Sequence, residues 1–370
     1  MKTCTFGKTG CTVSRLGFGA MRLPTVQQGE NSVIDEDEAV RIIRYAIDNG
    51  VNYVDTAYFY HGGESEIVVG KALRDGYREK ALLATKLPMG EVKCTEDFDR
   101  ILNDQLSKLG TDHIDFYLFH ALNEKHWETA KKLGLVEKMH EAKADGRIRH
   151  MGFSFHDNPE IFTRIVDEYD GCEFCQIQMN YLDIDHQAGI DGLHYAASNG
   201  LGVVIMEPVR GGRLANPDEE IAKLLPQDRT PVESALSFLW DIGDISVILS
   251  GMSNFEQVKQ NIKSADRYDV GCLTAQERAC FAEAKKAFDR STLIPCTRCN
   301  YCQPCPNDVR IPDVFAAYNK VAEGGMHAVR AAMPEIEEII DRCIQCGLCE
   351  EKCPQQIKIT EQLKNIQRRF

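Results

Sequence analysis

Two cysteine runs near the C-terminal end constrain the fold of this chain more than any other feature. Eight of the 15 cysteines lie between residues 296 and 353, and the other seven are scattered over the first 280 residues. Neighbouring cysteines within each run are separated by two or three residues. In a chain of 370 residues this spacing indicates metal ligation rather than the disulfide framework of a short secreted domain. The eight cysteines are Cys296, Cys299, Cys302 and Cys305 in the first run and Cys343, Cys346, Cys349 and Cys353 in the second.

The second run, C-I-Q-C-G-L-C-E-E-K-C-P, resembles the pattern that binds 4Fe-4S clusters in bacterial ferredoxins. In that pattern three thiolates of a run bind one cluster and the fourth binds its neighbour, so the resemblance implies two 4Fe-4S clusters held by all eight cysteines. The first run is one residue short before Cys305, which is tolerable because the resemblance implies that this cysteine reaches across to the partner cluster. Zinc is the alternative metal, but it does not explain the prolines that follow both runs, Pro306 and Pro354.

Thirty-seven residues separate the two runs, and they carry helical patterns, with one helix expected over 312–322 and stopped by Gly324 and Gly325. A segment of this length resembles the α-helical ferredoxin-like domain of succinate dehydrogenase iron-sulfur subunits. We therefore expect two domains, residues 1–290 and residues 291–370.

The charge balance excludes two classes of partner. The 43 Lys and Arg residues against 56 Asp and Glu residues give a net charge of −13, which disfavours nucleic acid and anionic membrane surfaces. No apolar run reaches the roughly 20 residues of a membrane span, and residues 1–10 lack the apolar centre of a signal peptide. The sequence predicts a cytoplasmic protein.

The first 290 residues alternate short β-branched runs with longer amphipathic stretches, which is typical of a parallel sheet covered by helices. Eight such units predict a (β/α)8 TIM barrel, preceded by a hairpin over residues 3–13. An open Rossmann-type sheet is disfavoured, because no expected strand leads into a G-x-G-x-x-G turn. The expected strands lie near 16–21, 51–55, 81–85, 114–119, 150–153, 174–178, 203–206 and 246–249.

Four polar residues follow successive expected strands, where a barrel carries its chemistry. Asp55 ends the second strand with Tyr60 five residues later, Lys86 follows the third strand and His120 ends the fourth. Each one alone has an ordinary explanation as a turn residue, a wall aromatic, a solvated lysine or a hydrogen-bonded histidine. Together they would bring an acid, a base and a proton carrier to one rim.

With these four residues in these positions, the first 290 residues resemble the aldo-keto reductase family. In that family Tyr, Lys, Asp and His form a catalytic tetrad, so the resemblance implies catalytic roles for Tyr60, Lys86, Asp55 and His120. The matching segments are SRLGFGAMRLP at 14–24, DTA-x-x-Y at 55–60, ATKLP at 84–88, the histidine at 120, GFS at 152–154, QIQMNYLD at 176–183, EPVRGGRL at 207–214 and SGMSNFEQVKQN at 250–261.

These residue types suit carbonyl reduction. Hydride transfer builds negative charge on the carbonyl oxygen, so a donor must give up a proton there. A nearby ammonium such as Lys86 lowers the pKa of a phenol by favouring its anion. Asp55 would hold that ammonium in place, and His120 would hydrogen-bond the substrate oxygen.

The resemblance also implies a nicotinamide cofactor, NADH or NADPH. Several positions depart from the family pattern: Phe155 stands where many members carry asparagine, Met206 where an aromatic stacks on the nicotinamide, and Asn254 where a basic residue often meets a 2′-phosphate. Glu207 replaces a serine near the pyrophosphate, so Arg210 or Arg213 is needed to offset its charge. The implied cofactor-binding residues are Ser154, Gln176, Glu207, Pro208, Arg210, Gly211, Gly212, Gly251, Ser253, Gln257 and Asn261.

These expectations combine into an oxidoreductase that reduces a carbonyl or related small molecule and transfers electrons through two 4Fe-4S clusters. Nicotinamides give two electrons at once and clusters take them singly. Three arrangements therefore stay open: structural clusters on an NAD(P)H reductase, a flavin at the barrel mouth, or clusters that feed the substrate directly. A redox partner protein is a further expectation. A different class of function, a silent barrel on an electron-transfer or docking module, is disfavoured by the intact tetrad.

Overall fold

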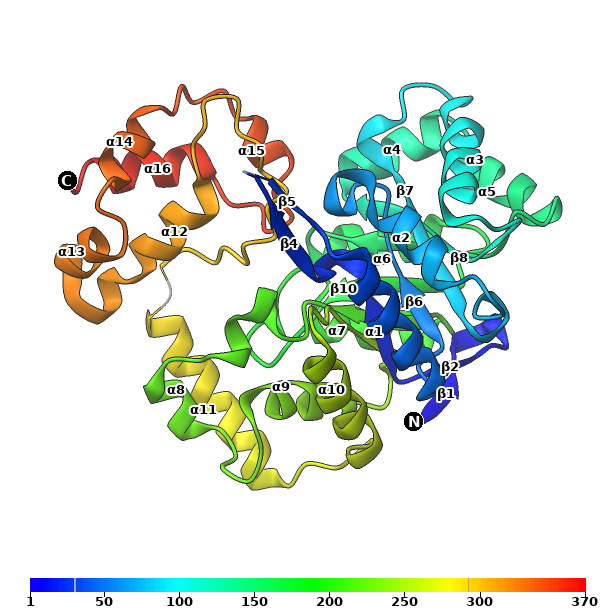
Figure 1. Ribbon diagram of the computed structural model, residues 1–370, viewed down its shortest axis with the longest axis horizontal. Coiled ribbons are helices and arrows are strands. Elements are labelled where there is room, and N and C mark those ends of the chain that lie inside the picture. Colours follow the sequence, from blue (N-terminus) through cyan, green and yellow to red (C-terminus); the bar gives the residue numbers. More distant parts are fainter. Residues whose placement is uncertain (30, 292) are drawn as a thin grey trace. The chain divides into compact units, whose positions relative to one another are not determined.

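The computed structural model describes residues 1–29, 31–291 and 293–370, and Figure 1 shows the course of the chain. The chain forms two compact units. The first comprises Met1–Pro208 and Val232–Thr274, and the second comprises Val209–Pro231 and Ala275–Phe370. These limits follow the contacts of the folded chain, and the domain boundary after residue 290 stays a prediction.

The first unit contains a closed barrel of eight parallel strands, which confirms the predicted fold class. Hydrogen-bonded neighbours run in the order β3, β6, β7, β8, β9, β10, β11, β12 and back to β3. All eight strands overlap the segments expected from the alternating pattern. Their bounds are β3 Leu16–Gly19, β6 Tyr53–Asp55, β7 Leu82–Pro88, β8 Ile114–Leu122, β9 Ile148–Phe155, β10 Phe174–Gln178, β11 Gly202–Met206 and β12 Val247–Ser250.

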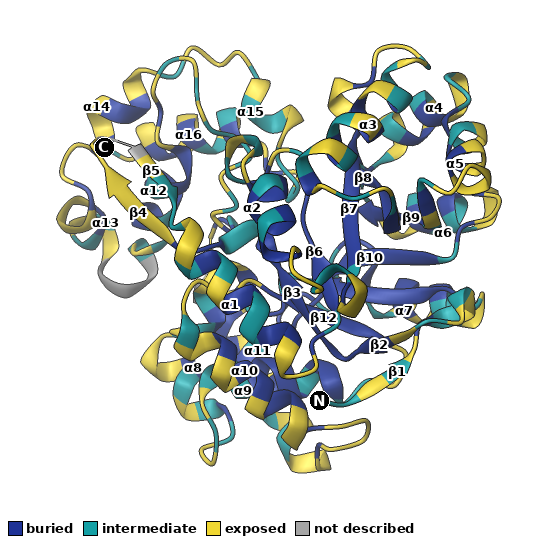
Figure 2. Cartoon of the chain, turned by 45° about the vertical axis from the view of Figure 1, so that its right-hand side comes forward, coloured by how far each residue is buried: buried dark blue, intermediate teal, exposed yellow. Residues whose placement is uncertain are grey.

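Helices surround the barrel with one apolar face inward, so the strands are buried while the outer helix faces are exposed (Figure 2). The ends of α1 and α3 show why the helices begin and end where they do. Asp35 caps α1 by accepting a hydrogen bond from the Glu38 amide, and Gly110 ends α3 in the left-handed region at φ 63°. The helices are α1 Glu36–Asp48, α2 Ser65–Ala72, α3 Asp97–Leu109, α4 Glu124–Lys132, α5 Leu135–Ala144, α6 Pro159–Glu168, α7 Gly189–Ser198, α9 Pro231–Trp240 and α10 Phe255–Arg267.

The predicted N-terminal hairpin closes the N-terminal end of the barrel. Strands β1 (Thr3–Thr5) and β2 (Thr12–Ser14) pair antiparallel, and the chain between them carries Phe6, which is fully buried. The Phe6 ring packs 5.0 Å from Phe116 and 5.5 Å from Phe174, measured between ring centroids. An aromatic cluster therefore fills this end of the barrel.

A second hairpin was not expected from the sequence. Strands β4 (Thr25–Gln28) and β5 (Asn31–Ile34) pair antiparallel between β3 and α1. The residues of β4 are all exposed, so this strand lacks the buried alternate positions that make a strand visible in a sequence.

The second unit is helical and has an apolar core of its own. Its helices are α8 Glu219–Leu224, α11 Ala275–Ser291, α12 Ile311–Asn319, α13 Val321–Ala332, α14 Ile336–Asp341, α15 Leu348–Glu351 and α16 Ile359–Gln367. Phe315 and Ile336 are among its fully buried residues. The expected helix over 312–322 ends at Asn319, and the glycines expected to stop it lie inside α13 instead. Among the described residues, no helix is long and apolar enough to cross a membrane.

The packing of Phe6 predicts a steric cost at Gly202. A Cβ atom at Gly202 would lie 2.2 Å from Cδ2 of Phe6, whereas one at Gly90 would meet no described residue within 4 Å. Gly202→Ala should therefore destabilise the barrel by about 1–3 kcal/mol, and Gly90→Ala should be close to neutral. Denaturant unfolding followed by tryptophan fluorescence measures this, because both tryptophans, Trp127 and Trp240, belong to the first unit. Equal unfolding midpoints for the two variants would contradict the packing of Phe6.

Candidate active site

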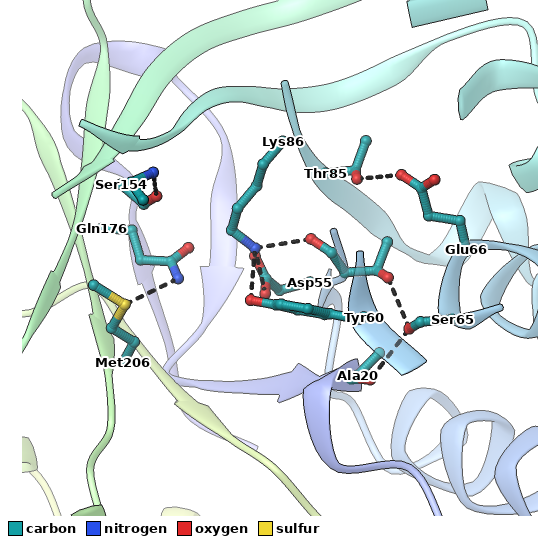
Figure 3. A network of polar contacts seen from close by, with 12 residues as sticks. Ala20, Asp55, Tyr60, Ser65, Glu66, Thr85, Lys86, Ser154, Gln176 and Met206 are labelled. Atoms are coloured by element: carbon teal, nitrogen blue, oxygen red, sulfur yellow. Dashed lines mark hydrogen bonds and ion pairs between the residues drawn. The ribbon is translucent and has the colours of Figure 1, made fainter. Parts of the chain in front are cut away.

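A buried ion pair between Lys86 and Asp55 forms the centre of the site (Figure 3). Lys86 comes from β7 and Asp55 ends the adjacent strand β6. The Nζ atom of Lys86 donates to both carboxylate oxygens of Asp55, at 2.8 and 2.7 Å, and to the Thr56 carbonyl at 2.8 Å. It also lies 3.5 Å from the phenol oxygen of Tyr60. The ammonium is thus held between a carboxylate and a phenol.

Burial and charge act in opposite directions on this pair. Burial lowers the pKa of Lys86, and the Asp55 carboxylate opposes that shift. Burial likewise raises the pKa of Asp55, and Lys86 opposes it. Each group thus partly offsets the desolvation of the other, and their contact lies beside the Tyr60 hydroxyl.

The loop after β6 presents Tyr60 to the pair. Tyr60 begins a 3-10 turn, Tyr60–Gly63, in which His61 and Gly62 take left-handed backbone angles of φ 53° and 67°. The Nε2 atom of His61 accepts a hydrogen bond from the Leu23 amide at 3.1 Å, which fixes this turn. His61 therefore supports the loop that carries Tyr60.

His120 completes the predicted group of four. It lies on β8, and its ring stands at 83° to the Tyr60 ring with centroids 6.2 Å apart. Burial, with smaller contributions from Lys86 and two other histidines, holds the pKa of His120 well below its ordinary range. A neutral imidazole is thus available as a hydrogen-bond donor at neutral pH. The structure brings all four predicted residues of the tetrad to the carboxyl ends of adjacent strands.

A second buried network behind Lys86 was not singled out in the sequence. Thr85 and Gln105 each donate a hydrogen bond of 2.6 Å to Oε1 of Glu66, and Gln105 also donates to the Lys86 carbonyl at 3.1 Å. Glu66 is fully buried, and burial raises its pKa. Its Oε2 atom has no hydrogen-bond partner among the described residues. The one sequence feature that could have pointed to this network is the acidic residue Glu66 within the mainly apolar start of α2, SEIVVG.

Two predicted cofactor residues lie on β9 and β10. Gln176 is buried, and its Nε2 atom lies 3.6 Å from the sulfur of Met206. In the part of the chain that the structure describes, its Oε1 atom has no hydrogen-bond partner. The Ser154 hydroxyl accepts a hydrogen bond from the Ala121 amide at 2.7 Å. Phe155 packs in the barrel wall with its ring centroid 5.0 Å from that of Phe162. Gln176 therefore keeps hydrogen-bonding capacity that a carboxamide could use, whereas Phe155 is a core residue.

Four further predicted cofactor residues lie in or just before the N-terminal part of α10. Asn254 caps this helix by accepting from the Gln257 amide at 3.0 Å, and the Gln257 side chain accepts from the Ser253 amide at 2.8 Å. Asn261 donates to the Ser250 hydroxyl at 2.9 Å. A Cβ atom at Gly251 would lie 2.9 Å from Cγ of Arg22, so this backbone runs close to a neighbouring side chain. These polar groups stabilise the turn that opens α10.

The segment after β11 crosses from the first unit to the second, with the boundary directly after Pro208. Glu207, the last residue before that proline, takes a left-handed φ of 58°, and its carbonyl accepts from Asn180 Nδ2 at 3.1 Å. Within the second unit, the guanidinium groups of Arg210 and Arg213 lie 4.6 and 4.4 Å from the Phe288 ring centroid. Gly211 and Gly212 lie between them with φ 61° and 92°. Pyrophosphate binding by this segment stays a prediction.

The eight cysteines of the two runs line two pockets in the second unit. The first pocket is lined by Cys302, Cys305, Cys343, Cys346 and Cys349, and the second by Cys296, Cys299, Cys302 and Cys353. The last cysteine of each run therefore lines the same pocket as the first three cysteines of the other run. No three metal-binding side chains among the described residues already converge on a single ion position, so this grouping describes pocket walls.

Comparison with known proteins matches both parts of the chain. The model of the aldo/keto reductase family matches residues 15–271. The chain belongs to the aldo/keto reductase family. The model of a 4Fe-4S dicluster domain matches residues 295–357, so this family member carries a C-terminal iron-sulfur domain.

Individual relatives of this aldo/keto reductase are distant. L-galactose dehydrogenase from Arabidopsis thaliana is 27% identical over 69% of the chain and 85% of its own length. NADH-specific methylglyoxal reductase from Escherichia coli is 26% identical over 71% of the chain and 93% of its own length. An aldo-keto reductase from Bacillus halodurans, solved in its holo form, is 27% identical with a TM-score of 0.65 and covers 77% of this chain and 96% of its own. The chain is thus an oxidoreductase of this family.

The neutral state of His120 has a consequence for the stability of the reductase. An unfolded histidine binds a proton below about pH 6.5, whereas the folded pKa of His120 is lower, so folding is opposed as the pH falls below 6.5. His120→Gln should therefore lose less stability on acidification than the wild type, by up to about 1.4 kcal/mol per pH unit. Unfolding curves from tryptophan fluorescence at several pH values measure the difference.

The matched control is His194→Gln, which removes a histidine more than half exposed on α7. This variant should follow the wild-type pH dependence more closely than His120→Gln does. Parallel curves for wild type and His120→Gln would show that His120 is not held neutral by the fold.

Proposed function

We propose that this aldo/keto reductase reduces the carbonyl group of a small molecule, with Tyr60 as the proton donor. The observation that carries the proposal is the position of the Lys86 ammonium, which is bound to Asp55 at 2.7 Å and lies 3.5 Å from the Tyr60 hydroxyl. The same arrangement disfavours a silent barrel, because a buried charge pair is costly to maintain.

Each residue has a role that follows from its environment. Negative charge develops on the substrate oxygen during reduction, and Tyr60 transfers its phenolic proton to that oxygen. Lys86 stabilises the phenolate that remains, and Asp55 keeps the ammonium charged and oriented. Neutral His120 donates a hydrogen bond to the same oxygen and so orients the carbonyl. The reacting oxygen therefore lies between Tyr60 and His120.

A nicotinamide cofactor supplies hydride when it is bound. The buried Gln176 amide supports this assignment, because its Oε1 atom lacks a partner within the described ranges and can accept from a carboxamide. The E. coli relative is named as NADH-specific, and a related reductase from Klebsiella pneumoniae, 23% identical with a TM-score of 0.62, was solved with NADPH. Since the Asn254 side chain caps α10 and carries no charge, we expect weak discrimination between the two nucleotides.

The C-terminal domain is proposed to hold two 4Fe-4S clusters, which supply one-electron transfer when bound. The two pockets support this hypothesis, since each is lined by thiols from both runs. Cys302 lines both pockets, so the clusters would be neighbours and electrons could pass between them. A redox partner protein would exchange electrons with this domain. A flavin between clusters and nicotinamide is the alternative that reconciles one-electron and two-electron carriers.

Tyr60→Phe tests the catalytic proposal. Loss of the proton donor should lower kcat for reduction of small aldehydes by at least about a hundredfold and leave nucleotide binding nearly unchanged. The measurement is anaerobic NADH and NADPH oxidation by the purified holoprotein, together with nucleotide titration.

Tyr58→Phe is the matched control, because it removes a hydroxyl two residues away on the same loop and should keep most of the activity. Turnover by Tyr60→Phe close to that of Tyr58→Phe would remove Tyr60 from the role of proton donor.

Two cysteine variants test how the clusters are bound. Cys353 lines the pocket of the first run and Cys305 the pocket of the second, so Cys353→Ala and Cys305→Ala should each damage a different cluster. Iron content should fall from about eight atoms per chain towards about four, and the two variants should lose different signals in electron paramagnetic resonance spectra. Cys280→Ala, on α11 outside both runs, should retain all the iron. Loss of the same signal in both variants would contradict the exchange of ligands between runs.

A further inference from the structure

A cysteine, a histidine and a glutamate lie in line at the N-terminal end of the barrel. Cys11 precedes β2, His150 lies near the start of β9, and Glu173 immediately precedes β10. The Cys11 sulfur lies 3.4 Å from His150 Nε2, and His150 Nδ1 lies 2.9 Å from Glu173 Oε1. The tetrad residues lie at the carboxyl ends of their strands, so this group is separate from the active site.

The hydrogen bonds around Glu173 assign the proton on the histidine ring. Burial alone would raise the pKa of Glu173, but hydrogen bonds from His150 and Lys143 outweigh it and bring this pKa to about 2. An ionised carboxylate only accepts hydrogen bonds, so His150 must donate from Nδ1. In the neutral form of the ring, which the proposed site requires, Nε2 is then the acceptor that faces the Cys11 thiol.

Packing holds the two reacting groups in position. The His150 ring stacks on Phe116 with centroids 5.1 Å apart and an angle of 24° between the rings. The Cys11 amide donates to the Thr9 hydroxyl at 3.2 Å, and the Cys11 carbonyl accepts from the Phe6 amide at 2.8 Å. The thiol is only partly buried, so a small reagent can reach it.

We propose that Cys11, His150 and Glu173 form a nucleophilic thiol site that takes soft carbon electrophiles of the α,β-unsaturated carbonyl class. A thiol next to a histidine that is oriented by a carboxylate is the usual arrangement of an activated cysteine. The inference does not depend on the reductase activity, because none of its residues belongs to the tetrad.

The reaction balances without any further reagent. The Cys11 proton passes to His150 Nε2, and the sulfur forms a bond to the β-carbon of the electrophile. The carbon–carbon π bond opens, and the α-carbon takes a proton back from His150. The thiol thus adds across the double bond, and no external oxidant or reductant is consumed.

N-ethylmaleimide is a suitable probe, because it is an α,β-unsaturated carbonyl compound. The anaerobic holoprotein is labelled at neutral pH, and the rate at each cysteine is read by mass spectrometry of peptides. Cys11 should react at least about tenfold faster than Cys94 and Cys272, although both of these are exposed. Equal or slower labelling of Cys11 would overturn the proposal.

Two variants separate activation from accessibility. His150→Gln removes the base, and Glu173→Gln removes the charge while keeping an acceptor for His150, so both should slow labelling of Cys11 by about tenfold or more. Near pH 10, where thiols ionise without help, the rates of wild type and variants should converge. A rate difference that persists there would show that the variants only change access to the thiol, and would also overturn the proposal.

Tryptophan fluorescence unfolding verifies that each variant is folded. If His150→Gln does not fold, Glu173→Gln alone decides, because a wild-type labelling rate in that variant contradicts activation. Reductase activity should be unchanged in both variants, so failure of the thiol proposal and failure of the reductase proposal are distinguishable.

Discussion

The buried ion pair of Lys86 and Asp55 is the interaction on which the catalytic rim depends. Taking both charges out of water costs roughly several kcal/mol for each ion, and short hydrogen bonds must offset this cost. The two carboxylate contacts and the Thr56 carbonyl oppose this cost, although burial still lowers the pKa of Lys86 and raises that of Asp55. The geometry requires the register of β6 and β7, in which Asp55 pairs with Ala84, two residues before Lys86. The closed barrel therefore fixes the distance between the two charges, and Tyr60 and His120 are placed around them.

Much of the barrel could be predicted from the sequence, because its strands are short β-branched runs that lead to helices with recognisable caps. The residues at the strand ends were predicted for the same reason, since parallel strands deliver them to one rim. What escaped prediction lacked such periodicity. The exposed hairpin of β4 and β5 has no buried alternate residues, and Glu66 is a single acid in an apolar segment whose partners, Thr85 and Gln105, come from other elements. Long-range polar contacts of this kind leave no local pattern.

The cysteine-rich part shows a similar division. The spacing of the cysteines indicated metal ligation. The pockets show in addition which thiols lie together, with Cys353 beside the thiols of the first run. The apolar core around Phe315 and Ile336 was less apparent, because its residues are spread over several short helices. In the same unit the guanidinium groups of Arg210 and Arg213 cover Phe288, so the segment after β11 contributes to packing as well as to any role in binding a nucleotide.

Closure of one barrel end by Phe6 limits the sides from which the tetrad can be reached. Among the described residues, the N-terminal hairpin and the aromatic cluster beneath it fill the barrel end that lies opposite the tetrad. A ligand that reaches Lys86 and Tyr60 would then enter and leave on the tetrad side of the barrel. If two ligands bind there in one turnover, the one that lies deeper would have to arrive first and leave last, so this shape would favour an ordered kinetic scheme.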